Sequence, residues 1–521
     1  MLLGHRYRPL IILAVAFLYL SGVPFAAYAF TNTQAAAQVL GQSSFTSNDP
    51  ANTVSGEAAP SAIAFDSSGD LWVADTFNAR VSEYTPPFTE GEAASLVLGQ
   101  ASLGVSGCNN GGLSAASLCD PFGLAFDSSG NLWVADAVNN RVLEYVKGSG
   151  FATGQAAALV LGQPDFTHSE WNQCDCVSDT ASTFNNPWGI AFDSSGNLWV
   201  ADAGNNRVLE FVKGAGFSTD QAAALVIGQP DFTHSERNQC DCGTPSATSL
   251  SGPYDVAFGS SGNLWVADDQ NARVLEYQKG AGFTDEEAAT LVIGQSSFTT
   301  GSSNGGDGIS ASVLGEASYL AFDSSGNLWV SDGFGFSSGD SRVLEYSPGF
   351  STGEAASLVL GQQDFTHGEW NQCDCDSPTG STLDAPAGLA FDSSGNLWVA
   401  DAGNNRVLEF QGTPPTPTSL PPVIPKTLSF IRTSGSGGPL TGKLVGLYGP
   451  GIVYNIPGYV PTPGVSLYAI SFCYMASENA IQISGFSNYQ VGFNSTEVSV
   501  SNWASVLTSA QGWPSEPACT S

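Results

Sequence analysis

Short apolar runs alternate with polar turns along most of this chain. In one stretch, Gly189 to Asp193 (GIAFD) leads through the turn Asp193 to Asn197 (DSSGN) into the β-forming run Leu198 to Asp202 (LWVAD). A second turn containing Gly and Asn precedes Arg207 to Phe211 (RVLEF), where apolar and polar residues alternate with period two. Ala222 to Gly228 (AAALVIG) is a fourth apolar run. These four runs predict four short antiparallel strands joined by tight turns.

The first three runs of this unit occur six times, and the fourth run follows each copy except the last. The tryptophans of its LWVAD-like run lie 61 to 69 residues apart, at Trp72, Trp133, Trp199, Trp265, Trp329 and Trp398. A fixed period of this kind marks a repeat architecture. Four short antiparallel strands in each repeat indicate the blade of a β-propeller.

The fourth run of each unit ends in LGQ or IGQ, and the positions of these tripeptides predict how the ring closes. They begin at Leu40, Leu98, Leu161, Ile227, Ile293 and Leu360. One therefore precedes the first complete unit, and none follows the last. We expect Gln38 to Gln42 to supply the fourth strand of the last blade, which leaves no open sheet edge at that junction. The predicted fold is all-β: a closed six-bladed propeller with four-stranded blades, followed by a small β-rich C-terminal domain.

The repeated core DSSGNLWVAD…NNRVLE resembles the NHL repeat family, in an exported form with long repeats that contain LGQ. The resemblance covers roughly residues 36–411. Propellers of this kind include RNA-binding proteins and also enzymes, namely a peptidyl-hydroxyglycine amidating lyase and gluconolactonase-like hydrolases. The enzymes imply His or acidic metal ligands that converge on the channel. Here no His lies on an expected inner strand, and Asp255 is the only acid that breaks the inner-strand pattern.

The first residues predict export. Arg6 and Arg8 precede the apolar run Leu10 to Leu20, and Ala27 to Ala29 has the form of a signal-peptidase site. No later stretch is long and apolar enough to span a bilayer, so we expect a secreted or extracytoplasmic protein, in a periplasm or at a cell surface. The expected domains are a signal peptide at 1–29, the propeller at 30–411, a Pro-rich linker at 412–426 and the β-rich domain at 427–521.

The chain is strongly acidic. It has 48 Asp and Glu against 15 Lys and Arg, and its formal net charge is −33. This charge argues against binding nucleic acid through a basic surface. The partners that we expect are therefore a protein or a glycan, and the sequence leaves the oligomeric state open.

Three of the long inserts after LGQ carry nearly identical boxes, each with a His six residues before the first Cys of a C-D-C. The residues are His168, Cys174 and Cys176; His234, Cys240 and Cys242; and His367, Cys373 and Cys375. One interpretation is a metal site in each loop, in which Asp165, Asp231 or Asp364 can join the imidazole and the two thiolates. A second is disulfide bonding, within a C-D-C or between loops, which we favour because we expect the chain to be exported and it has ten Cys. Free thiols are the third.

The remaining cysteines also predict disulfides. Cys108 and Cys119 bracket an insert and are expected to pair, as are Cys473 and Cys519 in the C-terminal domain. No cofactor is expected, and zinc, copper or calcium are the cations left open. The inserts at 43–60 and 296–317 contain neither Cys nor His, which excludes a metal ring shared by all six blades.

A second candidate site lies at the expected channel mouth. Phe122, Trp188 and Tyr254 occupy one equivalent position in three consecutive repeats, and Asp255 and Tyr319 replace small residues at the next position. Such an arc can stack a sugar or a peptide side chain. The alternative, which we favour, is that the rings pack against the preceding proline and the adjacent blade.

In a propeller, the long inserts share one face with the turns between second and third strands, and loops on a rigid scaffold usually carry binding. The repeated Asp202, Asn206 and Arg207 set is expected to be structural, because it recurs in nearly every blade. We therefore expect a non-catalytic scaffold that binds a protein, glycan or envelope ligand through its loop-rich face. The alternatives are a lyase or lactonase-like enzyme, with a metal in the channel or in the His/Cys loops, and a structural cell-surface component.

Overall fold

The fold is described from a computed structural model of the chain. Residues 30–173, 179–241, 243–306, 308–333 and 340–412 are described, together with the backbone of three strands between 427 and 472. The chain divides into two compact units, one containing the propeller and the other containing those three strands. The predicted signal peptide, nearly all of the predicted linker, and Cys473 and Cys519 lie outside the described residues.

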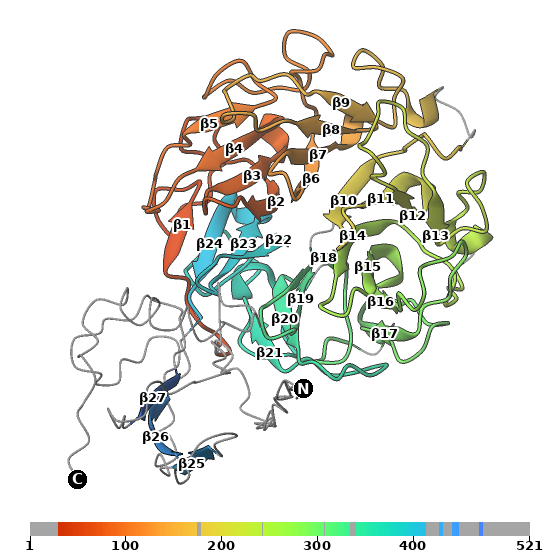
Figure 1. Cartoon of the computed structure of the whole chain (residues 1–521). Coiled ribbons are helices and arrows are strands. Elements are labelled where there is room, and N and C mark those ends of the chain that lie inside the picture. The colour runs from red at the N-terminus through yellow and green to blue at the C-terminus, as the bar shows by residue number, and fades with distance from the viewer. Residues whose placement is uncertain are drawn as a thin grey trace, which may run out of the picture. The chain divides into compact units, whose positions relative to one another are not determined.

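Six four-stranded antiparallel sheets surround a central channel, which confirms the predicted propeller (Figure 1). Blade 1 contains β2 (Pro60–Phe65), β3 (Leu71–Asp75), β4 (Arg80–Tyr84) and β5 (Leu96–Leu98). Blade 2 contains β6 (Pro121–Phe126), β7 (Leu132–Asp136), β8 (Arg141–Tyr145) and β9 (Leu159–Leu161). Blade 3 contains β10 (Pro187–Phe192), β11 (Leu198–Asp202), β12 (Arg207–Phe211) and β13 (Leu225–Ile227).

The other three blades repeat this order, with the first strand of each blade beside the channel. Blade 4 contains β14 (Pro253–Phe258), β15 (Leu264–Asp268), β16 (Arg273–Tyr277) and β17 (Leu291–Ile293). Blade 5 contains β18 (Ala317–Phe322), β19 (Leu328–Asp332), β20 (Arg342–Tyr346) and β21 (Leu358–Leu360). Blade 6 contains β22 (Pro386–Phe391), β23 (Leu397–Asp401), β24 (Arg406–Phe410) and the N-terminal strand β1 (Gln38–Leu40).

Short 3₁₀ helices occur in two places on the blades. Those between the second and third strands are η1 (Thr76–Asn78), η2 (Ala137–Asn139), η4 (Ala203–Asn205), η6 (Asp269–Asn271) and η9 (Ala402–Asn404). Those in the inserts are η3 (Trp171–Gln173), η5 (Arg237–Gln239), η7 (Ser303–Gly306) and η8 (Trp370–Gln372). Among the described residues, no helix has the length and apolarity needed to cross a bilayer.

The fourth strand of each blade is shorter than its apolar run predicts. In blade 3 the run begins at Ala222, but β13 begins only at Leu225. The N–H of Ala223 donates instead to the carbonyl of Ala181 in the preceding insert, at 2.7 Å. Gly228, with φ at 91°, then turns the chain out of the sheet. One part of the apolar run therefore pairs with the blade, and another part bonds to the preceding insert.

The ring closes as the tripeptide count predicts. β1 pairs antiparallel with β24, and Val39 lies opposite Leu408 in the register. Both side chains are fully buried. Figure 1 shows the red N-terminal strand beside the blue β24, so the first and last strands of the propeller share one sheet. The polar side chain of Gln42 completes the junction by donating to the carbonyl of Asn405 at 3.0 Å.

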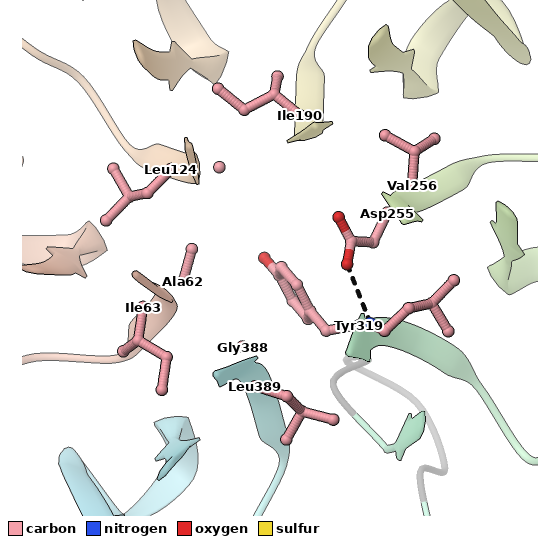
Figure 2. A pocket seen from close by; sticks show the side chains of 11 residues that line it. Ala62, Ile63, Leu124, Ile190, Asp255, Val256, Tyr319, Gly388 and Leu389 are labelled. Carbon is pink, nitrogen blue, oxygen red and sulfur yellow. Dashed lines mark hydrogen bonds between the residues drawn. The ribbon is translucent and has the colours of Figure 1, made fainter. Parts of the chain in front are cut away.

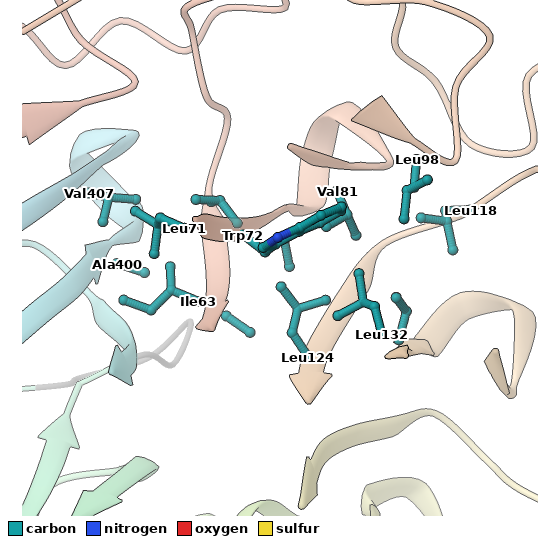
Figure 3. Packing of buried hydrophobic residues seen from close by; sticks show 14 of the residues in the cluster. Ile63, Leu71, Trp72, Val81, Leu98, Leu118, Leu124, Leu132, Ala400 and Val407 are labelled. Carbon is teal, nitrogen blue, oxygen red and sulfur yellow. The ribbon is translucent and has the colours of Figure 1, made fainter. Parts of the chain in front are cut away.

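Tryptophan–phenylalanine contacts join each blade to the next. Trp133 of blade 2 makes edge-on contacts with Phe192 and Phe217 of blade 3, with ring centroids 5.9 and 4.8 Å apart. At the junction of blades 5 and 6, Trp329 contacts Phe391 and the N-terminal Phe30 in the same way. Figure 3 shows the core around Trp72, where side chains of blades 1, 2 and 6 meet. Aromatic rings of this size contribute much of the apolar area that holds a core together.

A buried Asp–Arg pair in every blade fixes the inserts. In blade 3, Arg207 Nε contacts Asp202 Oδ2 at 2.8 Å, and both side chains are fully buried. Arg207 Nη1 and Nη2 donate to carbonyls of the two flanking inserts, those of Phe232 and Thr183, at 2.7 and 3.0 Å. Asp202 Oδ1 accepts the backbone N–H of Asn185 at 2.7 Å. A buried charge needs such full pairing, so the repeated set has the structural role expected of it.

The three described strands of the second unit form a sheet of their own. β25 (Thr427–Phe430), β26 (Leu440–Leu447) and β27 (Tyr468–Phe472) are antiparallel in the order β25-β26-β27. The described part of the C-terminal region is therefore β-structured, as predicted.

Candidate functional site

The long inserts lie on the same face of the propeller as the turns between second and third strands. Gln229, at the start of an insert, donates to the carbonyl of Asn206 in the blade 3 turn at 3.0 Å. Further along the previous insert, Asn172 Oδ1 accepts a hydrogen bond from Asn205 Nδ2 at 2.8 Å. The predicted loop-rich face therefore exists, and buried side chains hold the bases of its loops.

Three inserts on this face present the same turn, which we call the D-F-T-H box: Asp165–His168, Asp231–His234 and Asp364–His367. In the first box, Asp165 Oδ1 accepts hydrogen bonds from the Thr167 backbone N–H and hydroxyl, both at 2.7 Å, and pairs with His168 Nδ1 at 2.8 Å. The other two boxes repeat these contacts within 0.1 Å. The three His side chains are 47, 45 and 40% exposed.

The hydrogen bonds within each box shift the pKa of both partners. The Thr167 hydroxyl and then the His168 ring hold the pKa of Asp165 down at about 2. The hydrogen bond to Asp165 raises the pKa of His168 above its usual value. Because Nδ1 faces the carboxylate, the Nε2 edge of the ring is the part that can meet a ligand. Each box therefore presents an imidazole in a fixed orientation, with more positive charge near neutral pH than a free histidine.

The cysteines of the inserts form disulfides where they are described. Cys373 bonds to Cys375, Cys108 bonds to Cys119, and Cys240 is also disulfide-bonded. Cys174, Cys176 and Cys242 lie outside the described residues. A sulfur in a disulfide offers no thiolate to a metal, so in this state the loop of His367 lacks the predicted ligand set. Across the described parts of the chain, no three His, Cys, Asp or Glu side chains gather as metal ligands would.

The aromatic arc of the inner strands exists, but its rings cover one another. Phe122 stacks on Trp188 with centroids 4.1 Å apart and planes 12° apart, and Trp188 contacts Tyr254 at 3.9 Å. Phe122 and Trp188 are only 7 and 6% exposed, and they form an apolar cluster with the buried Ala137 and Ala203. Tyr254, which is half-buried, is the most exposed ring of the three. The geometry matches packing between blades, and it leaves Tyr254 as the ring that a ligand can reach.

Asp255 and Tyr319 point into the channel from neighbouring blades (Figure 2). They line a cavity of about 110 Å³ together with backbone and apolar side chains of all six inner strands. The Tyr319 hydroxyl donates to the carbonyl of Phe122, across the ring, at 3.4 Å. Asp255 Oδ2 accepts the backbone N–H of Leu320 at 2.9 Å. The two polar side chains thus narrow the channel and link opposite and adjacent blades.

Glycines on the inner strands make this narrow arrangement feasible. A Cβ atom added to Gly189 would lie 2.2 Å from Asp255 Oδ1, and one added to Gly123 would lie 2.1 Å from the Trp188 carbonyl oxygen. Both distances are far inside van der Waals contact, so neither position tolerates a side chain. Burial raises the pKa of Asp255 to about 7, although backbone hydrogen bonds from Leu320 and Val256 oppose the shift. The channel therefore holds a carboxyl group that changes its charge near neutral pH.

One buried acid was missed by the sequence analysis. Glu57 is fully buried, and the Tyr84 hydroxyl donates a hydrogen bond to its Oε1. Burial, followed by repulsion from Asp75, raises the pKa of Glu57 well above its usual value. Aligning the six repeats on the last residue of each inner strand would have found it, because the other five repeats have an apolar residue at this position: Leu118, Phe184, Leu250, Leu314 and Leu383.

Fold and site together define a six-bladed β-propeller whose face of long inserts is the candidate binding surface. The NHL repeat family model matches residues 118–145, 184–211 and 383–410, which lie in blades 2, 3 and 6. These three segments of the chain are thus NHL repeats.

One relative among characterised proteins is Protein SUPPRESSOR OF QUENCHING 1, chloroplastic, from Arabidopsis thaliana. It is 24% identical over 360 residues, which cover 64% of this chain and 30% of that protein. The chain thus matches less than a third of the length of this relative.

Similar solved structures include two lyases and a protein of unknown function. A streptogramin B lyase has a TM-score of 0.38 and 14% identity, over 71% of this chain and 97% of that chain. Virginiamycin B lyase from Staphylococcus aureus has a TM-score of 0.37 and 12% identity, over 69% and 96%. A protein of unknown function from Bacteroides thetaiotaomicron has a TM-score of 0.41 and 14% identity, over 72% and 75%.

Proposed function

We propose that this chain is an exported, non-catalytic scaffold that binds a protein, glycan or envelope ligand through the loop-rich face of its propeller. The three D-F-T-H boxes are the contact points, and each contributes one imidazole. Export is supported by the N-terminal sequence and by the disulfides, which persist in oxidising compartments.

The observation that carries the proposal is the matched exposure of the three boxes. Their histidines differ by only 7 percentage points in exposure, and in each box the histidine pairs with an Asp that also accepts two hydrogen bonds from the Thr. A repeated contact on a rigid ring suits a ligand that itself repeats, such as a polysaccharide, or one large enough to reach several blades. Binding at several weak sites at once multiplies affinity through a high effective concentration.

The small size of the channel cavity favours ligand binding at the boxes over catalysis in the channel. A cavity of about 110 Å³ is well below the 300 to 1,000 Å³ that is usual for small-molecule sites. Both of its polar side chains already bond to neighbouring blades. An enzymatic site in the channel would require Tyr319 to move aside, whereas the boxes are accessible as they stand.

The test is binding of the purified full chain to a glycan array, a peptide array and isolated cell envelope. Variants carry His168→Gln, His234→Gln and His367→Gln, singly and together. Gln keeps a hydrogen-bonding group of similar size but removes the imidazolium. Each single change should weaken binding a few-fold, and the triple variant should lose about a hundredfold or more, because avidity is lost with each site. Equal binding by the native chain and the triple variant would refute the proposal.

The aromatic residues of the channel mouth are tested in the same assay. If Tyr254→Ala or Trp188→Ala weakens binding while the box variants do not, the ligand occupies the channel mouth instead. Unchanged binding in both would remove the arc from the site. Thermal unfolding of each variant serves as the control, since Trp188 is buried and its loss can destabilise the fold.

A further inference from the structure

We propose that the Cys373–Cys375 disulfide is a redox site that exchanges with external dithiols, whereas Cys108–Cys119 is a structural bond. The two bonds differ in exposure and in the length of chain that they close. Cys373 is exposed and Cys375 is half-buried, and they are two residues apart. Cys108 is exposed, but its partner Cys119 is 3% exposed, and the two are 11 residues apart.

The residues just before the C-D-C turn form the base of the loop, and hydrogen bonds hold them to blade 6 and to the start of the insert. Asn371, just before the turn, is buried, and its Nδ2 donates to Asn404 Oδ1 in the turn of blade 6 at 3.0 Å. Gln372 Nε2 donates to the carbonyl of Gly361 at 3.0 Å. These bonds lie outside the ring that the disulfide closes. Opening the disulfide therefore leaves the loop base and the blade in place.

A disulfide that closes so small a ring contributes little to the stability of the fold. The stabilisation that a disulfide supplies grows with the number of residues in the loop that it closes, and here the two cysteines are only two residues apart. Inside the ring, Asp374 has a φ of 49°, in the left-handed region, which Asp enters more readily than most other residues but at some cost in free energy. Reduction frees this residue to leave that conformation. Disulfides that are exposed or that constrain the backbone in this way are the ones that thiols reduce readily.

Cys108–Cys119 differs in the thiolate that reduction must release. An external thiolate can reach only Cys108, so the leaving group is Cys119, which is buried and whose N–H donates to Asp136 Oδ1 at 2.7 Å. Burial disfavours a charged thiolate, and a poor leaving group slows exchange. In the C-D-C turn, attack at the exposed Cys373 releases Cys375, which solvent can stabilise.

The reaction is a two-electron exchange. One thiolate of an external dithiol attacks Cys373 Sγ, which forms a mixed disulfide and releases the Cys375 thiolate. The second thiolate of the dithiol then attacks its own partner sulfur in the mixed disulfide and releases the Cys373 thiolate. The dithiol leaves as a cyclic disulfide, oxidised by two electrons, and the two cysteine thiolates take up protons from water.

Charge around the turn selects the thiol. Asp374 lies between the two cysteines and Asp376 follows them; both are exposed, in a chain with a formal net charge of −33. An anionic thiol is repelled as it approaches, and salt screens the repulsion. The substrate class is therefore a neutral or cationic dithiol. The insert that carries the second box shares these features, since Cys240 is exposed and disulfide-bonded and Asp241 has a φ of 51°.

The experiment treats the folded full chain with limiting dithiothreitol near neutral pH, traps free thiols with iodoacetamide over time, and maps the labelled peptides. Cys373 and Cys375 should be labelled at least about tenfold faster than Cys108 and Cys119. The protein should keep its native thermal unfolding when only the C-D-C pairs are labelled. Equal labelling rates for the two disulfides, or labelling of Cys373 only after unfolding, would overturn the proposal.

A second arm tests the charge selection. Glutathione, which is anionic, should react several-fold more slowly than cysteamine, which is cationic, at low salt, and the difference should shrink at high salt. D374N/D376N should speed the glutathione reaction several-fold. Both positions are exposed, so folding is not at risk. A glutathione rate that equals the cysteamine rate at low salt would refute the assignment of the substrate class. The D-F-T-H boxes retain their histidines in all of these variants, so this result is independent of ligand binding.

Discussion

The bodies of the blades repeat six times, but the channel wall does not. Every blade has the buried Asp–Arg pair, with contacts of 2.6 to 2.9 Å, and every junction has the edge-on tryptophan–phenylalanine contacts. At the channel, one inner-strand position is instead filled by residues of very different size and charge: Ala62, Gly123, Gly189, Asp255, Tyr319 and Gly388.

The difference follows from what surrounds each position. A residue in the body of a blade has the same surroundings in every repeat, so one solution serves all six. Six inner strands share a single small channel, so a large side chain from one strand needs small residues opposite. Tyr319 fits because Gly123 and Gly388 lie on the other inner strands. Asymmetry at the axis is therefore a requirement of packing.

The largest expected effect comes from breaking the sixfold body at its closure. A chain that lacks residues 30–43 loses β1 and the buried Phe30, Val39 and Leu40. At about 2 kcal/mol for each buried apolar side chain, the loss is roughly 6 kcal/mol or more. Thermal unfolding should shift to a much lower temperature, and blade 6 should become susceptible to proteolysis. A chain that begins at Phe30 is the control. A melting temperature unaffected by the deletion would contradict the closed ring.

A smaller but still large effect is expected from one Asp–Arg pair. Arg207→Ala leaves Asp202 buried without its counter-ion and leaves the Phe232 and Thr183 carbonyls without their donor. The free energy of unfolding should fall by about 3 to 5 kcal/mol, measured by urea denaturation. Arg406→Ala in blade 6 is the matched variant and should cost about the same. A loss confined to one of the two blades would show that the repeats are not energetically equivalent.

The smallest of the three effects is the pH dependence that the channel wall contributes. The pKa of Asp255 is about 7 in the folded chain, above its unfolded value of about 3.9. A raised carboxyl pKa means that the folded state holds the proton more tightly. The stabilisation is therefore complete below about pH 4 and is lost as the pH rises towards 7.

Asp255→Asn isolates this contribution, because an amide has no proton to lose and can still accept the Leu320 N–H. Between about pH 4 and 8, the native chain should lose about 3 to 4 kcal/mol more unfolding free energy than the variant. Comparing the two chains cancels the other buried acids, including Glu57. Parallel pH profiles for the two would mean that Asp255 is ionised in the folded state.

Much of the fold could be predicted because its determinants are local and repeated. The turn DSSGN shows why: Asp193 Oδ1 accepts the backbone N–H groups of Ser195 and Asn197, and Gly196 takes a φ of 82°. All of these partners lie within four residues. Ring closure could also be predicted, since counting the LGQ runs requires no three-dimensional information. The pairing of Cys108 with Cys119 follows from their position around one insert.

The sequence by itself thus determined six blades, their strands, the N-terminal closing strand and the structural Asp–Arg pairs. Only the tertiary structure decided which side chains meet. The Tyr319 hydroxyl contacts a carbonyl 197 residues away, and Trp188 is covered by rings from the two adjacent blades. Spacing along the chain encodes a strand, because a strand depends on neighbouring residues. The exposure of a ring or the pKa of a carboxyl depends on what other strands place around it, and the closed ring sets those distances.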